Sequence, residues 1–321
     1  MNLALKSDNR EIHSAVITGA TGMIGLALMK YLVKRKIKVL AVIRPGSAKR
    51  EWIPDDSLIK IKECDLADLG ALPDKDLGNY DVFFHLGWDS TFGDSRNHMY
   101  LQNSNIRYTL DSVELARRLQ CRIYVGAGSQ AEYGPVLEKL KPDTPAFPVN
   151  GYGMAKLCAG QMSRLMCENY GIRHEWARIL SIYGPYDNPG TLVMSGIRDF
   201  LKGRESSFTK GEQLWDYLYV EDCARALYLI AEKGTASDVY VVGSGEARPL
   251  AEYIEIIRDQ SNPLVAPGLG KKPYGGGQIM HLQADISKLS EDTGFVPQIC
   301  FEEGIRNTIF WVKEGINNED N

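Results

Sequence analysis

Hydrophobic positions along the chain follow two different periods. Short apolar runs, which are typical of buried β-strands, lie at Ser14–Thr18, Lys38–Ile43, Ile59–Cys64, Val82–Leu86, Arg122–Val125 and His174–Leu180. Between them apolar residues recur at helical intervals, as in Leu26–Val33, Tyr100–Leu119 and Tyr152–Tyr170. This alternation predicts an α/β fold, with a Rossmann-like, doubly wound parallel sheet covered by helices on both faces.

The regular alternation breaks after Tyr183-Gly184-Pro185. We therefore predict that residues 1–183 form a dinucleotide-binding domain, and that residues 216–243 return to it. Leu218–Glu232 and Val239–Val242 are the segments expected to rejoin the sheet. Residues 184–215 and 244–321, which include a loop rich in glycine and proline at 263–277, are predicted to form a smaller substrate-binding lobe.

Composition narrows the class of protein. With 321 residues and 44% hydrophobic content, the chain can bury a large core. A net charge of −4 without a basic stripe argues against nucleic-acid binding, and no apolar run reaches transmembrane length. The charged N-terminus does not resemble a signal peptide. The six cysteines are scattered and the five histidines form no ligand cluster, so we expect buried free thiols, no metal site and a cytoplasmic location.

A glycine-rich turn follows the first predicted strand. Gly19, Gly22 and Gly25 have a G-x-x-G-x-x-G spacing and lie between an apolar strand and an apolar helix. Glycine permits a tight turn and a close approach to pyrophosphate, and the helix N-terminus supplies free N–H donors. The alternative is a turn with no ligand, which its placement between strand and helix makes the weaker reading.

Tyr152 and Lys156 are spaced four apart near the start of a predicted helix. This spacing puts both side chains on one helix face. A tyrosine has a pKa near 10 and carries protons poorly at neutral pH, but an ammonium beside it favours the phenolate. Such a pair also occurs by chance on helix surfaces, so its meaning depends on the glycine turn that precedes it.

Taken together, these motifs resemble the extended short-chain dehydrogenase/reductase superfamily, in its nucleotide-sugar epimerase/dehydratase/reductase branch. Tyr183-Gly-Pro, Tyr219-Val-Glu-Asp and Gly294-Phe-Val-Pro complete the pattern, which covers nearly the whole chain. The resemblance implies that Tyr152 exchanges a proton with a sugar oxygen. It also implies that Ser129, four residues before Tyr133, hydrogen-bonds the same oxygen, and that Lys156 holds the nicotinamide ribose.

The resemblance also implies two sets of ligand contacts. The expected cofactor contacts, besides Tyr152 and Lys156, are Gly19, Thr21, Gly22, Met23, Ile24, Gly25, Arg44, Asp65, Leu66, Leu86 and Asn105. The expected substrate contacts are Ser129, Gln130, Ser181 and Trp215. By the same resemblance, Tyr100–Leu119 and Tyr152–Tyr170 pair with a second copy to form a homodimer.

Two departures from the family pattern bear on the reaction. Sugar 4,6-dehydratases carry an Asp-Glu pair after the catalytic residue, whereas this chain has Gln130 and Ala131, which disfavours elimination. Trp215 stands where many members have an arginine that grips the diphosphate. The basic residues that could replace this arginine are Lys202, Arg204, Lys210 and Arg248.

The end of the second strand favours NADP over NAD. Members that prefer NAD place an acid there, but this chain has Ile43 followed by Arg44, with Lys49 and Arg50 nearby. NADPH is the usual donor in biosynthetic reduction, so we expect reduction of a nucleotide-linked 4-keto-6-deoxyhexose. NAD remains possible, and a 4-epimerase that retains NAD is the close alternative. A third alternative is a non-catalytic sensor that binds a dinucleotide. The presence of Ser129, Tyr152 and Lys156 argues against it.

Overall fold

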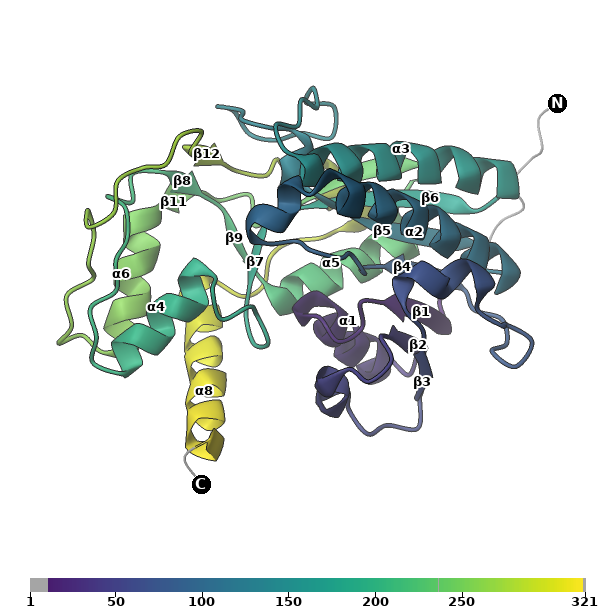
Figure 1. Ribbon diagram of the computed structural model, residues 1–321, viewed down its shortest axis with the longest axis horizontal. Helices are drawn as coiled ribbons and strands as arrows, with labels where there is room; N and C mark the ends of the chain where they lie inside the picture. The colour runs from purple at the N-terminus through teal and green to yellow at the C-terminus, as the bar shows by residue number, and fades with distance from the viewer. Residues whose placement is uncertain (1–10, 236, 320–321) are drawn as a thin grey trace.

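Seven parallel strands form the central sheet of the computed structural model, which describes residues 11–235 and 237–319 (Figure 1). Their spatial order is β10-β6-β5-β4-β1-β2-β3. Their bounds are β1 Ser14–Thr18, β2 Lys38–Ile43, β3 Ile59–Glu63, β4 Val82–His85, β5 Ile123–Ser129, β6 Arg173–Ile179 and β10 Asp238–Val242.

Helices cover both faces of this sheet because successive strand residues point to opposite sides. In β1, Ile17 packs with helices α1 (Met23–Lys34), α5 (Val220–Lys233) and α7 (Ser287–Thr293). Its neighbour Val16 packs on the other face, with α2 (Met99–Arg118), α3 (Gly151–Tyr170) and the short η2 (Leu66–Ala71). Strands β1, β2 and β4 read as almost continuous apolar runs, as expected when both faces are buried, whereas β6 buries His174, Glu175 and Arg178.

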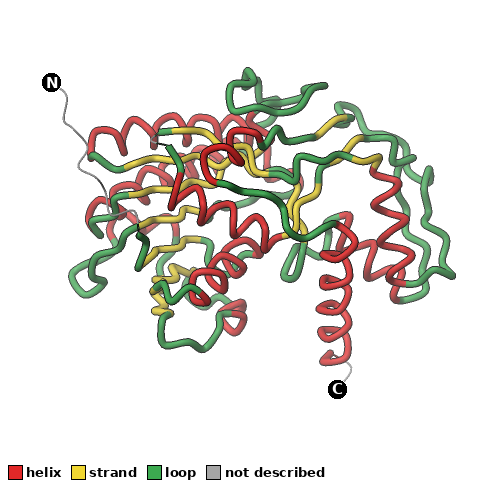
Figure 2. Tube along the Cα trace, turned by 180° about the vertical axis from the view of Figure 1, so that it is seen from behind, coloured by secondary structure: helices red, strands yellow, loops and turns green. Residues whose placement is uncertain are grey.

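The remaining elements lie beyond the carboxyl ends of the strands (Figure 2). Three helices pack into a separate hydrophobic cluster: α4 (Leu192–Leu201), α6 (Leu250–Ser261) and α8 (Phe301–Glu319). Two small sheets join this part to the rest, with orders β7-β9 and β11-β8-β12. Their strands are β7 Ser181–Tyr183, β8 Leu214–Trp215, β9 Tyr217–Tyr219, β11 Arg248–Pro249 and β12 His281–Leu282. Three further short helices are η1 Ala48–Trp52, η3 Gly93–Asn97 and η4 Gln130–Glu132.

The predicted α/β class and parallel sheet are confirmed, with two local corrections. Leu218–Glu232 does not return as a strand: most of it is helix α5, and β10 alone rejoins the sheet. Its apolar residues recur at helical spacing, which fits packing against the sheet rather than within it. The thiols are free, but Cys300 is exposed and Cys158 is partly exposed, so not all are buried. The division into two domains remains a prediction.

The order of the sheet locates a ligand crevice. From β1 the chain builds outward through β2 and β3, and it then crosses to β4 and builds the other way. In such sheets ligands bind beyond the carboxyl ends of the strands where the direction changes. This switch point lies between β1 and β4, directly beside Gly19. Among the described helices, none combines the length and apolar character needed to cross a membrane.

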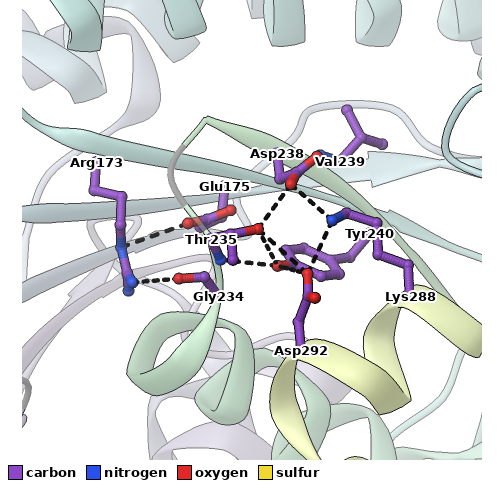
Figure 3. Close-up of polar contacts among 9 residues, drawn as sticks. All are labelled: Arg173, Glu175, Gly234, Thr235, Asp238, Val239, Tyr240, Lys288 and Asp292. Atoms are coloured by element: carbon purple, nitrogen blue, oxygen red, sulfur yellow. Dashed lines mark hydrogen bonds and ion pairs between the residues drawn. The ribbon is translucent and has the colours of Figure 1, made fainter.

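At the opposite end of β6, a polar cluster ties the sheet to α7 (Figure 3). Lys288 binds Asp238 and Asp292, at 2.8 and 2.9 Å. Nearby, the Glu175 carboxylate is fully buried, with the Arg173 guanidinium 3.4 Å away. Burial raises the pKa of Glu175 to about 8, and the charge of Arg173 offsets only part of that rise.

We therefore expect Glu175 to make the free energy of unfolding depend on pH. Its pKa in the folded chain lies above the usual value, so its contribution is complete below about pH 4.5 and is lost as pH rises through 8. Glu175→Gln should remove this loss, raising the free energy of unfolding relative to wild type by about 2–5 kcal/mol at pH 8.5. Urea unfolding at pH 5.5 and 8.5 measures the difference. Glu168→Gln, at an exposed carboxylate, should behave like wild type at both pH values.

Candidate active site

The glycine turn connects β1 to α1 at the switch point, and its geometry fits a pyrophosphate. Gly19 has a φ of 68°, and a Cβ there would lie 2.7 Å from the backbone nitrogen of Gly87. A Cβ on Gly25 would lie 2.3 Å from the carbonyl oxygen of Gly19. Gly22 precedes α1 and offers no side chain to cap the first N–H groups of the helix. Together these features leave a cradle for an anion at a helix N-terminus.

The other residues predicted for this cradle lie around it. Thr21 precedes the helix, and Met23 and Ile24 are its first two residues. The N–H of Leu86, just after β4, donates to the carbonyl of Thr18 at 3.2 Å. The backbone groups of the first turn of α1 and the carboxyl ends of β1 and β4 therefore meet in one place.

Arg44 follows β2 and is exposed, and its side chain has no ion pair within the described residues. Arg50, by contrast, is bound to Glu63 at 2.7 Å. The structure corrects one detail of the sequence interpretation. Ile43 is buried in the core beneath α1, so its side chain cannot face a ribose. Arg44 is the first exposed residue after the end of β2, so this chain has an arginine where members that prefer NAD have an acidic residue.

Asp65 and Asn105 fix the loops that follow β3 and β4. The Asp65 carboxylate accepts the N–H of Ala67 at 3.0 Å and thereby caps η2, which begins at Leu66. The buried amide of Asn105 accepts the N–H of Asp89 at 2.8 Å and donates to the carbonyl of the same residue at 3.0 Å. Both residues thus fix backbone at the site, and their direct contact with a cofactor remains a prediction.

Ser129 is the last residue of β5 and forms a capping box with Glu132. Its hydroxyl accepts the N–H of Ala131 at 3.2 Å, and its own N–H donates to Glu132 Oε1 at 2.8 Å. Glu132 is fully buried, and its Oε2 accepts a hydrogen bond from Arg178 Nε at 2.7 Å. A buried ion pair therefore anchors the turn that carries the serine.

Tyr152 and Lys156 lie on the first two turns of α3, which Asn150 caps by accepting the N–H of Gly153 at 2.9 Å. The Ser129 side chain lies close enough to Tyr152 to lower the pKa of the tyrosine. Lys156 is buried, and its Nζ donates to the carbonyl of Ala127 at 2.6 Å. The structure therefore brings the three predicted catalytic residues into one site.

The electrostatics differ from the expectation that Lys156 lowers the pKa of Tyr152. Burial raises the pKa of Tyr152 above its ordinary value, although hydrogen bonding from Ser129 and the charge of Arg96 oppose the rise. Burial also lowers the pKa of Lys156 to about 7, against the opposing charge of Glu132. The sequence interpretation assumed a permanently charged lysine, but removing an ammonium from water destabilises its charged form.

Two of the predicted substrate residues are in contact with each other, in the two small sheets. Trp215 in β8 donates its indole N–H to the hydroxyl of Ser181 in β7 at 2.8 Å. Gln130 is partly exposed directly after Ser129. Of the basic residues that could replace the missing arginine, Arg248 is paired with Glu302 at 2.6 Å and Arg204 with Asp199 at 2.9 Å. Lys202 and Lys210 are exposed.

Comparison with known proteins decides the family. Residues 15–243 match the family model described as the NAD dependent epimerase/dehydratase family. The chain belongs to this family. It is thus an enzyme of the extended short-chain dehydrogenase/reductase type, and the seven-stranded parallel sheet is the fold of that group.

Three relatives illustrate the range of this epimerase/dehydratase family. An uncharacterized UDP-glucose epimerase of Bacillus subtilis (strain 168), YtcB, is 26% identical and covers 92% of this chain and 97% of its own. A dTDP-glucose 4,6-dehydratase of Escherichia coli is 30% identical over 58% of this chain, and the match spans about half of that protein, 53%. The solved UDP-N-acetylglucosamine 4-epimerase of Methanobrevibacter ruminantium M1, in complex with UDP-N-acetylmuramic acid, has a TM-score of 0.84 at 26% identity, over 95% of this chain and 99% of that one.

The sequence analysis missed three residues that lie beside Tyr152, Lys156 and Ser129 in this chain. They are Trp88, Arg96 and Glu132. Lys156 Nζ lies 3.7 Å from the centroid of the Trp88 ring, and the Arg96 guanidinium lies 4.6 Å from that of Tyr152. Glu132 could have been found, because Ser-x-x-Glu is the sequence signature of a capping box. Trp88 and Arg96 come from the loop after β4, and no local pattern marks them.

Ser129→Ala is expected to lower kcat by about 10²-fold, because one donor to the reacting oxygen is lost. The dissociation constant for the dinucleotide should stay the same. Since the hydroxyl also caps η4, Ser129→Thr is the matched control: it keeps the hydroxyl and should retain most of the activity. Steady-state kinetics of both variants test the role. If Ser129→Ala turns over within a few-fold of wild type, Ser129 is not a donor in the reaction.

Proposed function

We propose that this enzyme reduces the 4-keto group of a nucleotide-linked 6-deoxyhexose, with NADPH as the hydride donor and Tyr152 as the proton donor. The observation that carries the proposal is the composition of the turn around Ser129. The serine, Tyr152 and Lys156 lie close together, which supports exchange of a hydride and a proton at one carbon and its oxygen. Elimination needs a further acid and base, and the two residues after Ser129 are Gln130 and Ala131.

Glu132 does not supply the missing acid. It is a carboxylate close to Ser129, but it is fully buried and already accepts hydrogen bonds from Arg178, Trp176 and the backbone of Ser129. A carboxylate held in this way acts as a structural anchor, because protonation would break its charge-assisted bond to Arg178. Oxidation or reduction at one carbon is the chemistry that remains.

Each residue then has a role. A bound nicotinamide supplies the hydride. Tyr152 donates its hydroxyl proton to the keto oxygen, and Ser129 donates a hydrogen bond to the same oxygen, which stabilises negative charge developing there. In its protonated form Lys156 donates one N–H to the carbonyl of Ala127 and has two more N–H groups with which to bind the nicotinamide ribose. Trp215 and Ser181, which are already joined, would contact the sugar nucleotide.

The preference for NADPH rests on Arg44. Its exposed guanidinium follows β2, at the position where an acid would bind the ribose hydroxyls of NAD. A reductase consumes a hydride in every turnover, and it therefore needs a cofactor that enters reduced and leaves oxidised.

A 4-epimerase is the second candidate. Two of the three relatives described above are named as epimerases and match over nearly their full length, although a dTDP-glucose 4,6-dehydratase matches over 92% of its length as well. An epimerase uses the same serine, tyrosine and lysine, but it oxidises and then reduces the same carbon and so retains its dinucleotide.

The test is to incubate the purified enzyme with a panel of nucleotide-linked 4-keto-6-deoxyhexoses and NADPH while recording absorbance at the NADPH band. We expect stoichiometric loss of NADPH with one member of the panel. The matched assay uses UDP-glucose and UDP-N-acetylglucosamine without added cofactor and follows the epimer by chromatography. Epimer formation together with dinucleotide that co-purifies with the protein would replace the reductase proposal with the epimerase.

We also infer a homodimer built from α2 and α3. These helices pack against one another, and α3 exposes apolar side chains, with Met154 49%, Met162 43% and Leu165 53% accessible. Burial of such a stripe against a second copy would remove apolar area from water. The molar mass from light scattering tests this inference, and a monomer at micromolar concentration would contradict it.

A further inference from the structure

Tyr152 has a second cation beside it that the serine–tyrosine–lysine arrangement does not include. The Arg96 guanidinium carbon lies 4.6 Å from the centroid of the Tyr152 ring. Lys156 Nζ is farther from that centroid, at 5.8 Å, and lies closer to the ring of Trp88, at 3.7 Å. Arg96 is thus the nearer of the two cations to the tyrosine.

The position of Arg96 is built into the fold. Its short helix, η3, is fixed to the start of α3, because the side chain of Asn97 accepts the N–H of Gly151 at 3.1 Å. The buried amide of Gln102 donates to the carbonyl of Ser95 at 3.1 Å and accepts the indole N–H of Trp88 at 3.0 Å. The loop after β4 is therefore held on both sides of the arginine.

Arg96 has no competing anion. Its Nε is buried and has no hydrogen-bond partner within the described residues, and no carboxylate forms an ion pair with it there. A buried donor without a partner is costly unless something compensates for it. The face of the Tyr152 ring provides part of that compensation through a cation–π contact, which becomes stronger when the hydroxyl ionises.

We propose that Arg96 is a positioning residue for the reaction: it supplies the permanent positive charge that keeps the Tyr152 hydroxyl ready to release its proton. This role rests on the proposed function of Tyr152 as the proton donor. The charged groups that face Tyr152 are Arg96 from η3, Lys156 from its own helix and Glu132 from η4. Glu132 opposes the phenolate, whereas both cations favour it.

The division of labour between the cations follows from their chemistry. A guanidinium stays charged throughout the working range of pH, while a buried ammonium loses its proton readily. Burial brings the pKa of Lys156 down to about 7, so near neutrality this lysine is charged only part of the time. Arg96 sustains the field at the tyrosine when Lys156 is neutral.

The experiment measures the ionisation of Tyr152 directly, without substrate. The protein is labelled with 13Cζ-tyrosine, and the NMR signal that is absent in Tyr152→Phe identifies Tyr152. In Arg96→Gln, we expect about tenfold less phenolate than in wild type at a fixed pH below the midpoint of titration. Arg96→Lys should restore most of it. An unchanged titration in Arg96→Gln would overturn the proposal.

Two controls separate this result from other effects. Arg107→Gln removes the same charge from α2, where the guanidinium lies over Tyr108 rather than Tyr152, and should leave the Tyr152 signal as in wild type. The far-ultraviolet circular dichroism and thermal midpoint of each variant confirm that it folds. Because the titration needs no turnover, it stands even if the keto-sugar assays fail. Where turnover is measured in the direction of reduction, Tyr152 must carry its proton, so the alkaline limb of the kcat profile should move to higher pH in Arg96→Gln. A rise in KM alone, with an unchanged profile, would make Arg96 a substrate-binding residue instead.

Discussion

Tyr152→Phe is expected to lower kcat by about 10³-fold while leaving the affinity for the dinucleotide unchanged. The substitution removes the hydroxyl that transfers the proton and keeps the ring, so the contacts to Trp88 and Arg96 remain. The serine could still donate a hydrogen bond to the reacting oxygen, which leaves some turnover. Single-turnover kinetics with a saturating substrate measure the loss.

The matched control for this variant is Tyr100→Phe, which removes a hydroxyl from an exposed side chain on α2 and should be silent. Cofactor binding is followed separately, by fluorescence, so that a binding defect is not mistaken for a catalytic one. Turnover of Tyr152→Phe within a few-fold of wild type would exclude the tyrosine as the proton donor. It would also remove the reason for the cation that faces its ring.

Local patterns predicted the scaffold of this site well, because each relevant signal lies within a few residues. Gly25 is required by contacts with Gly19 and Ala20 inside one turn, although Gly19 itself is confined by Leu86 and Gly87 from the neighbouring strand end. Tyr152 and Lys156 share a helix face by spacing alone. The parallel strands β1, β2 and β4, which are buried on both faces, are also visible in the sequence as apolar runs. Where the interactions that determine a feature lie within one segment, the sequence alone was sufficient to predict that feature.

What the sequence could not supply is the environment of these residues. The pKa of Lys156 is lowered because the side chain is buried. Its Nζ lies against the ring of Trp88, which belongs to the loop after β4. Arg96 meets Tyr152 across more than fifty positions of chain, in a turn that Gln102 and Asn97 help to hold in place. Such contacts depend on tertiary packing, and no periodicity encodes them.

The substrate side was the least predictable part for the same reason. Met194 lies in the predicted substrate-binding lobe, but its side chain is buried with α6 and α8. Arg248 is paired with Glu302 and so is already neutralised. If the substrate carries a diphosphate, we expect its charge to be balanced by Lys202 or Lys210, or by a rearrangement of the Arg248–Glu302 pair.

The cofactor prediction turns on one exposed side chain. If Arg44 binds the 2′-phosphate, Arg44→Ala should raise the dissociation constant for NADPH by about 10- to 100-fold and leave that for NADH nearly unchanged. This estimate corresponds to the loss of one charge-assisted hydrogen bond, about 1.5–3 kcal/mol. Arg50→Ala is the matched control, because Arg50 is already bound to Glu63 and should not affect either cofactor.

Reversal of the charge should go further than its removal. Arg44→Asp places a carboxylate at the first exposed position after β2, where it repels a 2′-phosphate and can accept hydrogen bonds from both ribose hydroxyls. Ile43 is unsuitable for the same change, because its side chain is buried in the core and an acid there would destabilise the fold. We expect Arg44→Asp to bind NADH more tightly than NADPH, as measured by calorimetric titration of both cofactors. If the wild type already binds the two equally, Arg44 does not select the phosphate. The main reason to favour a reductase over an epimerase then disappears, because it depends on a cofactor that is exchanged in every turnover.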